Sequence, residues 1–181
     1  MPDLVQAVAS LASIAPWGAP GLDYFAGMGE KNVEDMQLSI EDPAAARAKC
    51  EQDRVKTLAL TADDLRGYLR TLLSPPDLAV LTGDRADFQV AARRSGLAPG
   101  SEGWWADDRA FLSPWGFTCE SIRTPVLLRH GRQDRFVPFG HGEWLADHIP
   151  GVEALLTDDD GHLTLTTNHL EATHEWLLSH L

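Results

Sequence analysis

The hydrophobic positions along the chain follow two different patterns. Residues 5–14 form an almost continuous apolar run that Pro16 ends, and residues 126–130 and 152–157 form two shorter, mainly apolar segments. Continuous runs of this length are typical of strands buried on both faces of a parallel sheet. The sequence therefore predicts three strands, with a helix over residues 142–149 between the second and the third.

The stretch between the first two predicted strands carries helix signals and no strand signal. Asp42 before Pro43 and Thr61 at the head of a capping box both mark helix starts, and Gly96 suits a C-terminal cap. Residues 21–112 are therefore predicted to be a block of helices. The predicted helices cover residues 44–60, 61–73, a short stretch after Ser74, 84–95 and 104–112.

The last predicted helix begins at Asn168, and it should bury one face of residues at helical spacing. The residues of that face are Leu170, Thr173, Leu177 and Leu181. Strands that alternate with helices pair in parallel through right-handed crossovers. The predicted class is therefore α/β, with a core built from residues 1–20 and 113–181 and a helical insertion over residues 21–112.

The composition restricts the class of protein rather than the fold. The chain has 181 residues, 44% of them hydrophobic, and its 15 Lys and Arg against 27 Asp and Glu give a net charge of −12. This acidity argues against nucleic acid and against an anionic membrane surface as partners, because both bind through cationic side chains. No segment has the pattern of a membrane span or a signal peptide, so we expect a cytoplasmic protein.

The sequence offers little for a metal or a cofactor. Cys50 and Cys119 have neither metal-ligand nor redox spacing and are expected to be free thiols. Residues 158–160, three aspartates beside His162, are typical of a solvated acidic loop, and the other histidines lack ligand spacing. We therefore expect no metal and no cofactor.

Two side chains that can cooperate in catalysis follow consecutive predicted strands. Asp134 comes four residues after the strand at residues 126–130, and His162 lies in a Gly-His pair after the strand at residues 152–157. The carboxyl ends of parallel strands share one edge of a sheet, so both side chains should emerge there. A carboxylate bound to one ring nitrogen fixes the tautomer of a histidine and leaves the other nitrogen as a base. Taken alone, each residue is more typical of a turn or a solvated loop than of a catalytic site.

The segments around these two residues resemble the end of an α/β-hydrolase. Residues 124–138, TPVLLRHGRQDRFVP, are similar to the family's acid-bearing segment, G-x-x-D-x-x-V-P, and Gly161-His162 to the Gly-His pair that ends the next strand. Residues 113–117, SPWGF, resemble the return from the family's helical lid, and residues 5–14 resemble its sixth strand. The resemblance implies that Asp134 orients His162 as the general base of an ester or related acyl hydrolase.

The chain departs from this family at the nucleophile. The family carries its serine in G-x-S-x-G at a strand-to-helix turn, before the acid and the histidine, and no such motif occurs here. Residues 100–103, GSEG, have the wrong spacing, and Ser10 and Ser13 have no such turn. The oxyanion loop of the family is also absent. We therefore expect the chain to hold the acid and the histidine but neither the nucleophile nor the oxyanion donors.

The resemblance also directs attention to side chains that could line a substrate pocket beneath the lid. The candidates are Trp17, Phe25, Met28, Trp105, Trp115 and Phe117, and the same reasoning extends to Met36 and Trp104. Each of them could equally serve to hold the helices together.

Two functions remain open from the sequence. In the first, the chain belongs to a serine hydrolase for a small-molecule substrate, and the half that carries the serine is a complementing N-terminal polypeptide or was lost from this reading frame. In the second, it is a truncated, catalytically inactive relic or a binding module. Because the first strand lacks one neighbour and carries no charge, we also expect an edge strand that pairs with its copy in a homodimer. His162 is expected to be largely exposed, so that its removal would change stability little.

Overall fold

The computed structural model describes residues 4–181, and these residues contain a three-stranded parallel sheet in the order β1-β2-β3. The strands are β1 (Val8–Leu11), β2 (Val126–Gly131) and β3 (Glu153–Thr157). Val8 is in register with Val126, and Leu127 is in register with Glu153. The predicted α/β class with three parallel strands is confirmed.

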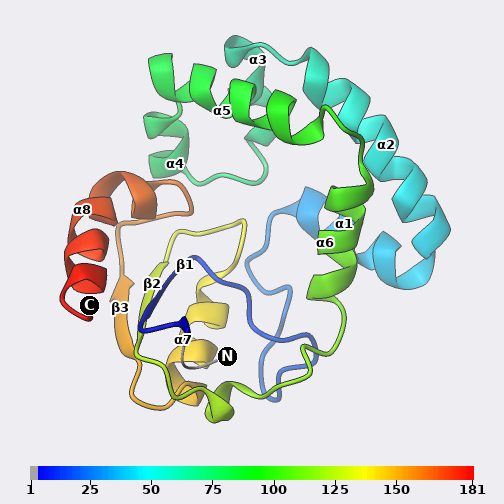
Figure 1. The fold of residues 1–181 in the computed structure, drawn as a ribbon. Coiled ribbons are helices and arrows are strands. Elements are labelled where there is room, and N and C mark those ends of the chain that lie inside the picture. Colours follow the sequence, from blue (N-terminus) through cyan, green and yellow to red (C-terminus); the bar gives the residue numbers. More distant parts are fainter. Residues whose placement is uncertain (1–3) are drawn as a thin grey trace.

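Helices surround this sheet in two groups (Figure 1). Helices α7 and α8 lie on either side of the sheet, while α1 to α6, here called the helical region, arch over the carboxyl ends of the strands. The elements before β2 are α1 (Glu30–Glu41), α2 (Pro43–Ala59), α3 (Ala62–Leu69), α4 (Pro75–Val80), α5 (Gly83–Leu97), α6 (Glu102–Phe111) and a 3₁₀ turn, η2 (Cys119–Ser121). The later helices are α7 (Phe139–His148) and α8 (Thr164–Leu178). No helix within residues 4–181 has the length and apolar character needed to cross a membrane.

Local capping explains where several helices begin. The Asp42 side chain accepts a hydrogen bond of 3.0 Å from the amide of Ala45, and Thr61 and Asp64 form a reciprocal capping box. The cap predicted at Gly96 is wrong, because α5 continues through this residue to Leu97. Helix α1 had no signal in the sequence analysis, since its N-cap, Gly29, has no side chain to mark the start.

Strand β1 differs from its prediction. It spans four residues instead of the ten of residues 5–14, and none of the four is fully buried. Ala12 ends the strand with a φ of 53°, in the left-handed region that residues other than glycine rarely adopt. The expectation of burial on both faces is wrong, because Val8 is exposed and the other three residues are only half-buried. Strand β1 pairs only with β2 and is an edge strand. Its position at the edge is as predicted.

Helix α8 begins earlier than predicted, at Thr164. Asn168 is not its cap but lies inside the helix, where its side chain donates to a carboxylate oxygen of Asp160 at 2.8 Å. The predicted buried face is confirmed at Thr173 but wrong at Leu170 and Leu181, which are 47% and 84% exposed. The buried residues of the helix are Thr164, Leu165 and Thr173.

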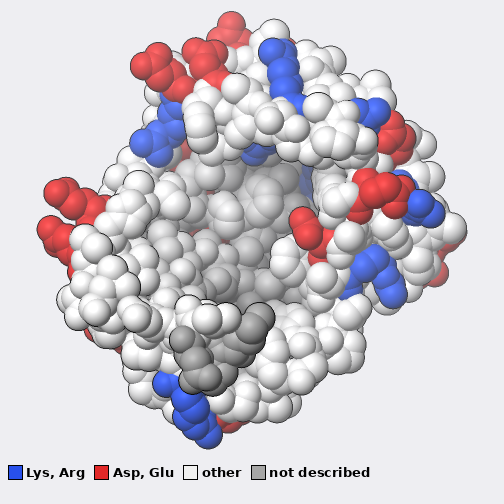
Figure 2. All heavy atoms as spheres, viewed as in Figure 1, with Lys and Arg blue, Asp and Glu red and all other residues white. Residues whose placement is uncertain are grey.

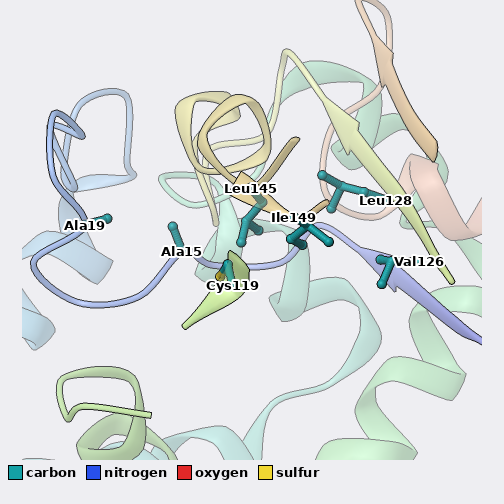
Figure 3. Packing of buried hydrophobic residues seen from close by; sticks show 7 residues of the cluster. All are labelled: Ala15, Ala19, Cys119, Val126, Leu128, Leu145 and Ile149. Carbon is teal, nitrogen blue, oxygen red and sulfur yellow. The ribbon is translucent and has the colours of Figure 1, made fainter. Parts of the chain in front are cut away.

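Two hydrophobic clusters correspond to the two parts of the molecule. The first joins β2 to α7 and to the segments before α1 and β2, and it contains Ala15, Ala19, Cys119, Val126, Leu128, Leu145 and Ile149 (Figure 3). The second lies within the helical region and contains Leu65, Leu69, Leu72, Leu73, Leu81, Ala86 and Val90. Phe136 and Leu163 pack against the second cluster. Phe136 follows Asp134 by two positions, and Leu163 directly follows His162. The helical region thus supports the loops that follow β2 and β3.

Candidate active site

Asp134 and His162 meet at the carboxyl end of the sheet. Nδ1 of His162 lies 2.9 Å from Oδ2 of Asp134, within the distance expected from the sequence. The other carboxylate oxygen, Oδ1, accepts the backbone amides of Phe136 at 2.7 Å and Val137 at 2.9 Å. The Asp134 side chain is completely buried. Three donors therefore hold this carboxylate in one orientation.

The loop that carries Asp134 depends on close backbone approach. A Cβ atom on Gly131 would lie 2.2 Å from the carbonyl oxygen of Asp160, so only glycine fits where this loop meets the loop after β3. His130 is buried beside Asp134, and burial lowers its pKa. Its Nε2 donates to the carbonyl of Val137 at 2.9 Å and lies 3.8 Å from Asp134. A neutral His130 therefore supports the loop and leaves the carboxylate to His162.

His162 is more enclosed than expected. Its side chain is 28% exposed, and its ring stacks on Phe136 with 4.8 Å between ring centroids. The expectation of a largely exposed histidine is therefore wrong, because both the carboxylate and the aromatic ring cover it. Within residues 4–181, Nε2 of His162 has no hydrogen-bond partner. This nitrogen is the one that a base would use.

A cavity of about 820 Å³ lies between the helical region and the sheet, and His162 lines it. Figure 2 shows the molecule hollowed between these two parts. Val137 and Ser13 lie on the sheet side of the cavity, and Trp104 and Cys50 lie on the side of the helices. The imidazole thus faces a space large enough for a small organic molecule.

The predicted pocket residues divide into two groups. Met28 and Trp115 line the cavity, as do Met36 and Trp104. The other four candidates do not line it: Trp17, Phe25, Trp105 and Phe117. Trp17 packs with Tyr24 and Phe25 outside the cavity, Trp105 lies beneath Arg109, and Phe117 packs on Trp115 and is 53% exposed. Trp17, Phe25 and Phe117 lie outside the helices, where the sequence has no period that shows which way a side chain faces.

The described residues place no activated nucleophile beside His162. The Ser13 hydroxyl lines the cavity but is hydrogen bonded to that of Ser10, and Ser101 donates to Glu51 at 2.8 Å in the helical region. Cys50 also lines the cavity, but burial raises the pKa of its thiol to about 11. A protonated thiol is a poor nucleophile at neutral pH.

A cluster of charges in the cavity wall escaped the sequence analysis. The Asp53 carboxylate is bound by the ammonium groups of Lys49 at 2.5 Å, Lys56 at 3.0 Å and Lys31 at 3.1 Å. Burial by itself would raise the pKa of Asp53, but these hydrogen bonds hold it well below its usual range. The four-residue spacing from Lys49 to Asp53 was the available signal. The long-range partner Lys31 had none.

The fold is that of the C-terminal part of an α/β-hydrolase. The chain superposes on a bromoperoxidase from Bacillus anthracis with a TM-score of 0.54 and 18% identity, over 96% of this chain and 57% of that one. An enol-lactonase from Burkholderia xenovorans LB400 gives 0.51 and 17%, over 96% and 56%. At these identities the likeness is one of fold.

Sequence comparison adds one short match. Over 48 residues the chain is 38% identical to a pimeloyl-[acyl-carrier protein] methyl ester esterase of Aromatoleum aromaticum, which covers 26% of this chain and 19% of the esterase. No model of a known protein family matches the sequence. The chain thus spans a little over half the length of the solved structures that it resembles.

Proposed function

We propose that Asp134 and His162 are the acid and the general base of a serine-type hydrolase that cleaves carboxylic esters. The observation that carries this proposal is the bond of 2.9 Å from His162 Nδ1 to a buried carboxylate, with Nε2 left free beside the cavity. An Asp–His pair of this kind keeps the second ring nitrogen unprotonated and able to accept a proton. The imidazole of His130 is neutral, so it does not compete with His162 for the carboxylate of Asp134.

The chemistry would proceed in two balanced steps. In the first, a serine hydroxyl gives its proton to Nε2 of His162 as its oxygen attacks the ester carbonyl. The imidazolium then gives that proton to the departing alcohol, which leaves an acyl-serine. In the second, water repeats the sequence, with Nε2 again taking and returning one proton. Asp134 stays ionised and stabilises the imidazolium throughout.

The serine in this proposal comes from outside the described residues. The candidate source is a polypeptide segment that adds to the free edge of β1 and presents a serine at a strand-to-helix turn. Ala12 and Ser13, directly after β1, line the same cavity as His162. A strand added beside β1 would therefore end next to the histidine, because parallel strands share their carboxyl edge.

The substrate class follows from the cavity and the comparisons. Apolar side chains such as Met36, Leu72 and Phe111 dominate its lining, which favours an acyl or alkyl chain over a sugar or nucleotide. The short match to an esterase supports an ester as the reacting group. The helical region would act as the lid that encloses this chain.

The test compares three samples in hydrolysis of p-nitrophenyl butyrate: this chain, the polypeptide encoded immediately upstream, and the two co-expressed. The proposal expects little hydrolysis by either part and a large gain when they are combined. His162→Ala should abolish the gain, while His174→Ala, a change on the outer part of α8, should leave it. A gain that survives His162→Ala would overturn the role of His162, and the absence of any gain would instead favour a binding module or an inactive relic.

A further inference from the structure

The carboxylate of Asp77, in the helical region, is hydrogen bonded to the loop that carries His162. Asp77 lies on α4 and is completely buried, 85 positions before His162 in the sequence. Its Oδ2 accepts the backbone amide of His162 at 2.8 Å. Its Oδ1 accepts the amides of Leu163 at 2.7 Å and Thr164 at 3.1 Å. One side chain thus binds three consecutive amides, beginning with that of the catalytic candidate.

The amides of Leu163 and Thr164 belong to the start of α8, which has no side-chain cap of its own, and the amide of His162 lies directly before them. Leu163 is the N-cap residue, and its side chain cannot accept a hydrogen bond. The first amides of a helix have no partner within the helix and carry a partial positive charge, so a carboxylate satisfies both demands. Asp77 supplies from a distant segment what Ser, Thr or Asp supplies locally in most helices.

Two residues around Asp77 support this contact: one donates a hydrogen bond to the carboxylate, and the other leaves space for it. The Ser74 hydroxyl, also buried, donates to Oδ2 of Asp77 at 2.9 Å. A Cβ atom on Gly161 would lie 2.2 Å from Oδ2 of Asp77 and 2.3 Å from the Ser74 hydroxyl. Position 161 therefore requires glycine, because any side chain there would displace the carboxylate.

We infer that Asp77 is a positioning residue for His162: it fixes the backbone of residues 162–164 so that the imidazole stays on Asp134. The inference rests on the proposed function for its catalytic meaning. It acts through the backbone, since Asp77 contacts the amide of His162 and not its ring. Because α4 packs against α8, the contact also ties one corner of the helical region to the loop that carries the histidine.

The alternative is that Asp77 only stabilises the fold, as a cap at a helix end does. The two roles differ in what happens to the ring. A purely structural role lowers the free energy of unfolding but leaves the His162 ring on Asp134 in every folded molecule. A positioning role loosens the ring in molecules that are still folded. A readout of the ring in the folded state therefore separates the two.

The experiment is ¹H–¹⁵N NMR of the histidine side chains in the folded chain, with the His162 signals assigned by His162→Ala. In the wild type we expect a single tautomer, protonated at Nδ1 and with a slowly exchanging proton bound to Asp134. Asp77→Asn keeps the shape but replaces one acceptor oxygen with a donor, which opposes an amide of residues 162–164. We expect it to give mixed tautomers or loss of the Nδ1 proton signal. An unchanged His162 spectrum would overturn the inference.

The matched control is Leu81→Ala, which removes a completely buried side chain from the same part of the helical region without touching the carboxylate. It should lower stability while leaving the His162 ring signals as in the wild type. Should Asp77→Asn fail to fold, Ser74→Ala, which removes the hydroxyl that donates to Oδ2 of Asp77, replaces it in the same NMR experiment. Mixed His162 tautomers or loss of the Nδ1 proton signal in this variant support the inference, and an unchanged His162 spectrum overturns it.

Activity gives a second, separate readout. In the complemented enzyme Asp77→Asn should lower kcat by ~10- to 100-fold with little change in KM, because a misplaced base slows chemistry more than binding. A change of the same size in KM, with kcat unchanged, would contradict a positioning role for Asp77. The NMR experiment needs no nucleophile, so an inactive complemented sample would refute the proposed function and leave the inference about Asp77 standing.

Discussion

The sheet and the helical region each bury a carboxylate, and they compensate the charge in different ways. Asp134 is held by two backbone amides and one imidazole, all placed by the loop after β2 and the loop after β3. Asp53 is held by three lysine ammonium groups, whose side chains range from 23% to 65% exposed. Both carboxylates are nearly inaccessible, with side-chain exposures of 0% and 6%.

The difference determines what each carboxylate can do. Backbone amides have fixed positions and fix the direction of Asp134, which leaves one oxygen aimed at His162. Lysine side chains are flexible and reach solvent, so they balance the charge of Asp53 without fixing a geometry that chemistry could use. The sheet side therefore holds the precise site, while the helical region holds a wall whose stability depends on charge and pH.

The largest expected effect is on the site. Asp134→Asn in the complemented enzyme should reduce kcat by roughly 10³- to 10⁴-fold, because the amide no longer selects the tautomer with a free Nε2. Ester hydrolysis measures it, with Asp158→Asn as control, since that aspartate is exposed and pairs with Arg132. A loss smaller than about tenfold would show that the backbone-held carboxylate has no special role.

The next effect is on stability and concerns the lysine cluster. Asp53→Asn should lower the free energy of unfolding by ~2 kcal/mol, less than the loss of a fully buried pair because water screens the ammonium groups. Urea unfolding at neutral pH measures it. Glu41→Gln, at the end of α1, is the control and should leave the urea midpoint nearly unchanged.

The pH dependence of the same cluster follows from the direction of the shift. The pKa of Asp53 is lower in the folded chain than in the unfolded chain, so its contribution is complete above about pH 4 and is lost as pH falls below that value. Asp53→Asn should therefore destabilise at pH 7 more than at pH 3. Equal losses at both values would mean that the lysines do not bind the carboxylate in solution.

The same contrast explains what could be predicted from the sequence. The Asp134–His162 contact was predictable because each residue follows a strand, and parallel strands place their carboxyl ends together. The short capping signals at Asp42 and Thr61 were also sufficient, since a cap involves only three or four neighbouring residues. Rules of local structure were therefore enough to predict the contact between Asp134 and His162, although the two residues are 28 positions apart.

The remaining features depend on contacts that no local rule describes. Asp77 looks like any acidic residue in the first turn of a short helix, and only the fold brings α8 to it. The length of β1 was overestimated because the apolar run of residues 5–14 does not reveal the left-handed backbone at Ala12, where the strand ends. The facing of Trp17 and Phe25 depended on loop geometry, for which the sequence carries no period.

A smaller effect sharpens the comparison within the cavity wall. Asp108 lines the cavity on α6, and burial raises its pKa to about 6, while a hydrogen bond from the Cys50 thiol opposes this shift. A carboxyl with a raised pKa binds more protons when folded, so it costs stability as pH rises from about 4 to about 6. Asp108→Asn should therefore stabilise the chain by ~1 kcal/mol at pH 7.5 and by little at pH 4.

Differential scanning calorimetry at the two pH values measures this effect. The control is Asp87→Asn, on an exposed position of α5. It should change stability by no more than about 0.5 kcal/mol at either pH value. A loss of stability for Asp108→Asn at pH 7.5 would show that the carboxylate has a cation partner in solution.

The smallest effect on folding stability concerns the open side of the sheet, a feature that the helical region lacks. Strand β1 is an edge strand, and Val5 and Val8 are 44% and 39% exposed at this end of the sheet. An uncharged apolar edge without proline is open to pairing with another strand, and a two-fold dimer through β1 is the simplest closed assembly. Size-exclusion chromatography with light scattering at tens of micromolar should therefore give a mass above that of the monomer.

Val8→Lys should restore the monomer while changing the free energy of unfolding by no more than about 0.5 kcal/mol, because a charge at an edge opposes pairing. The control Val55→Lys, on an exposed position of α2, should leave the assembly as it is. A wild-type chain that elutes as a single monomer would show that the edge of β1 is protected, and it would remove the support that this edge gives to a complementing segment.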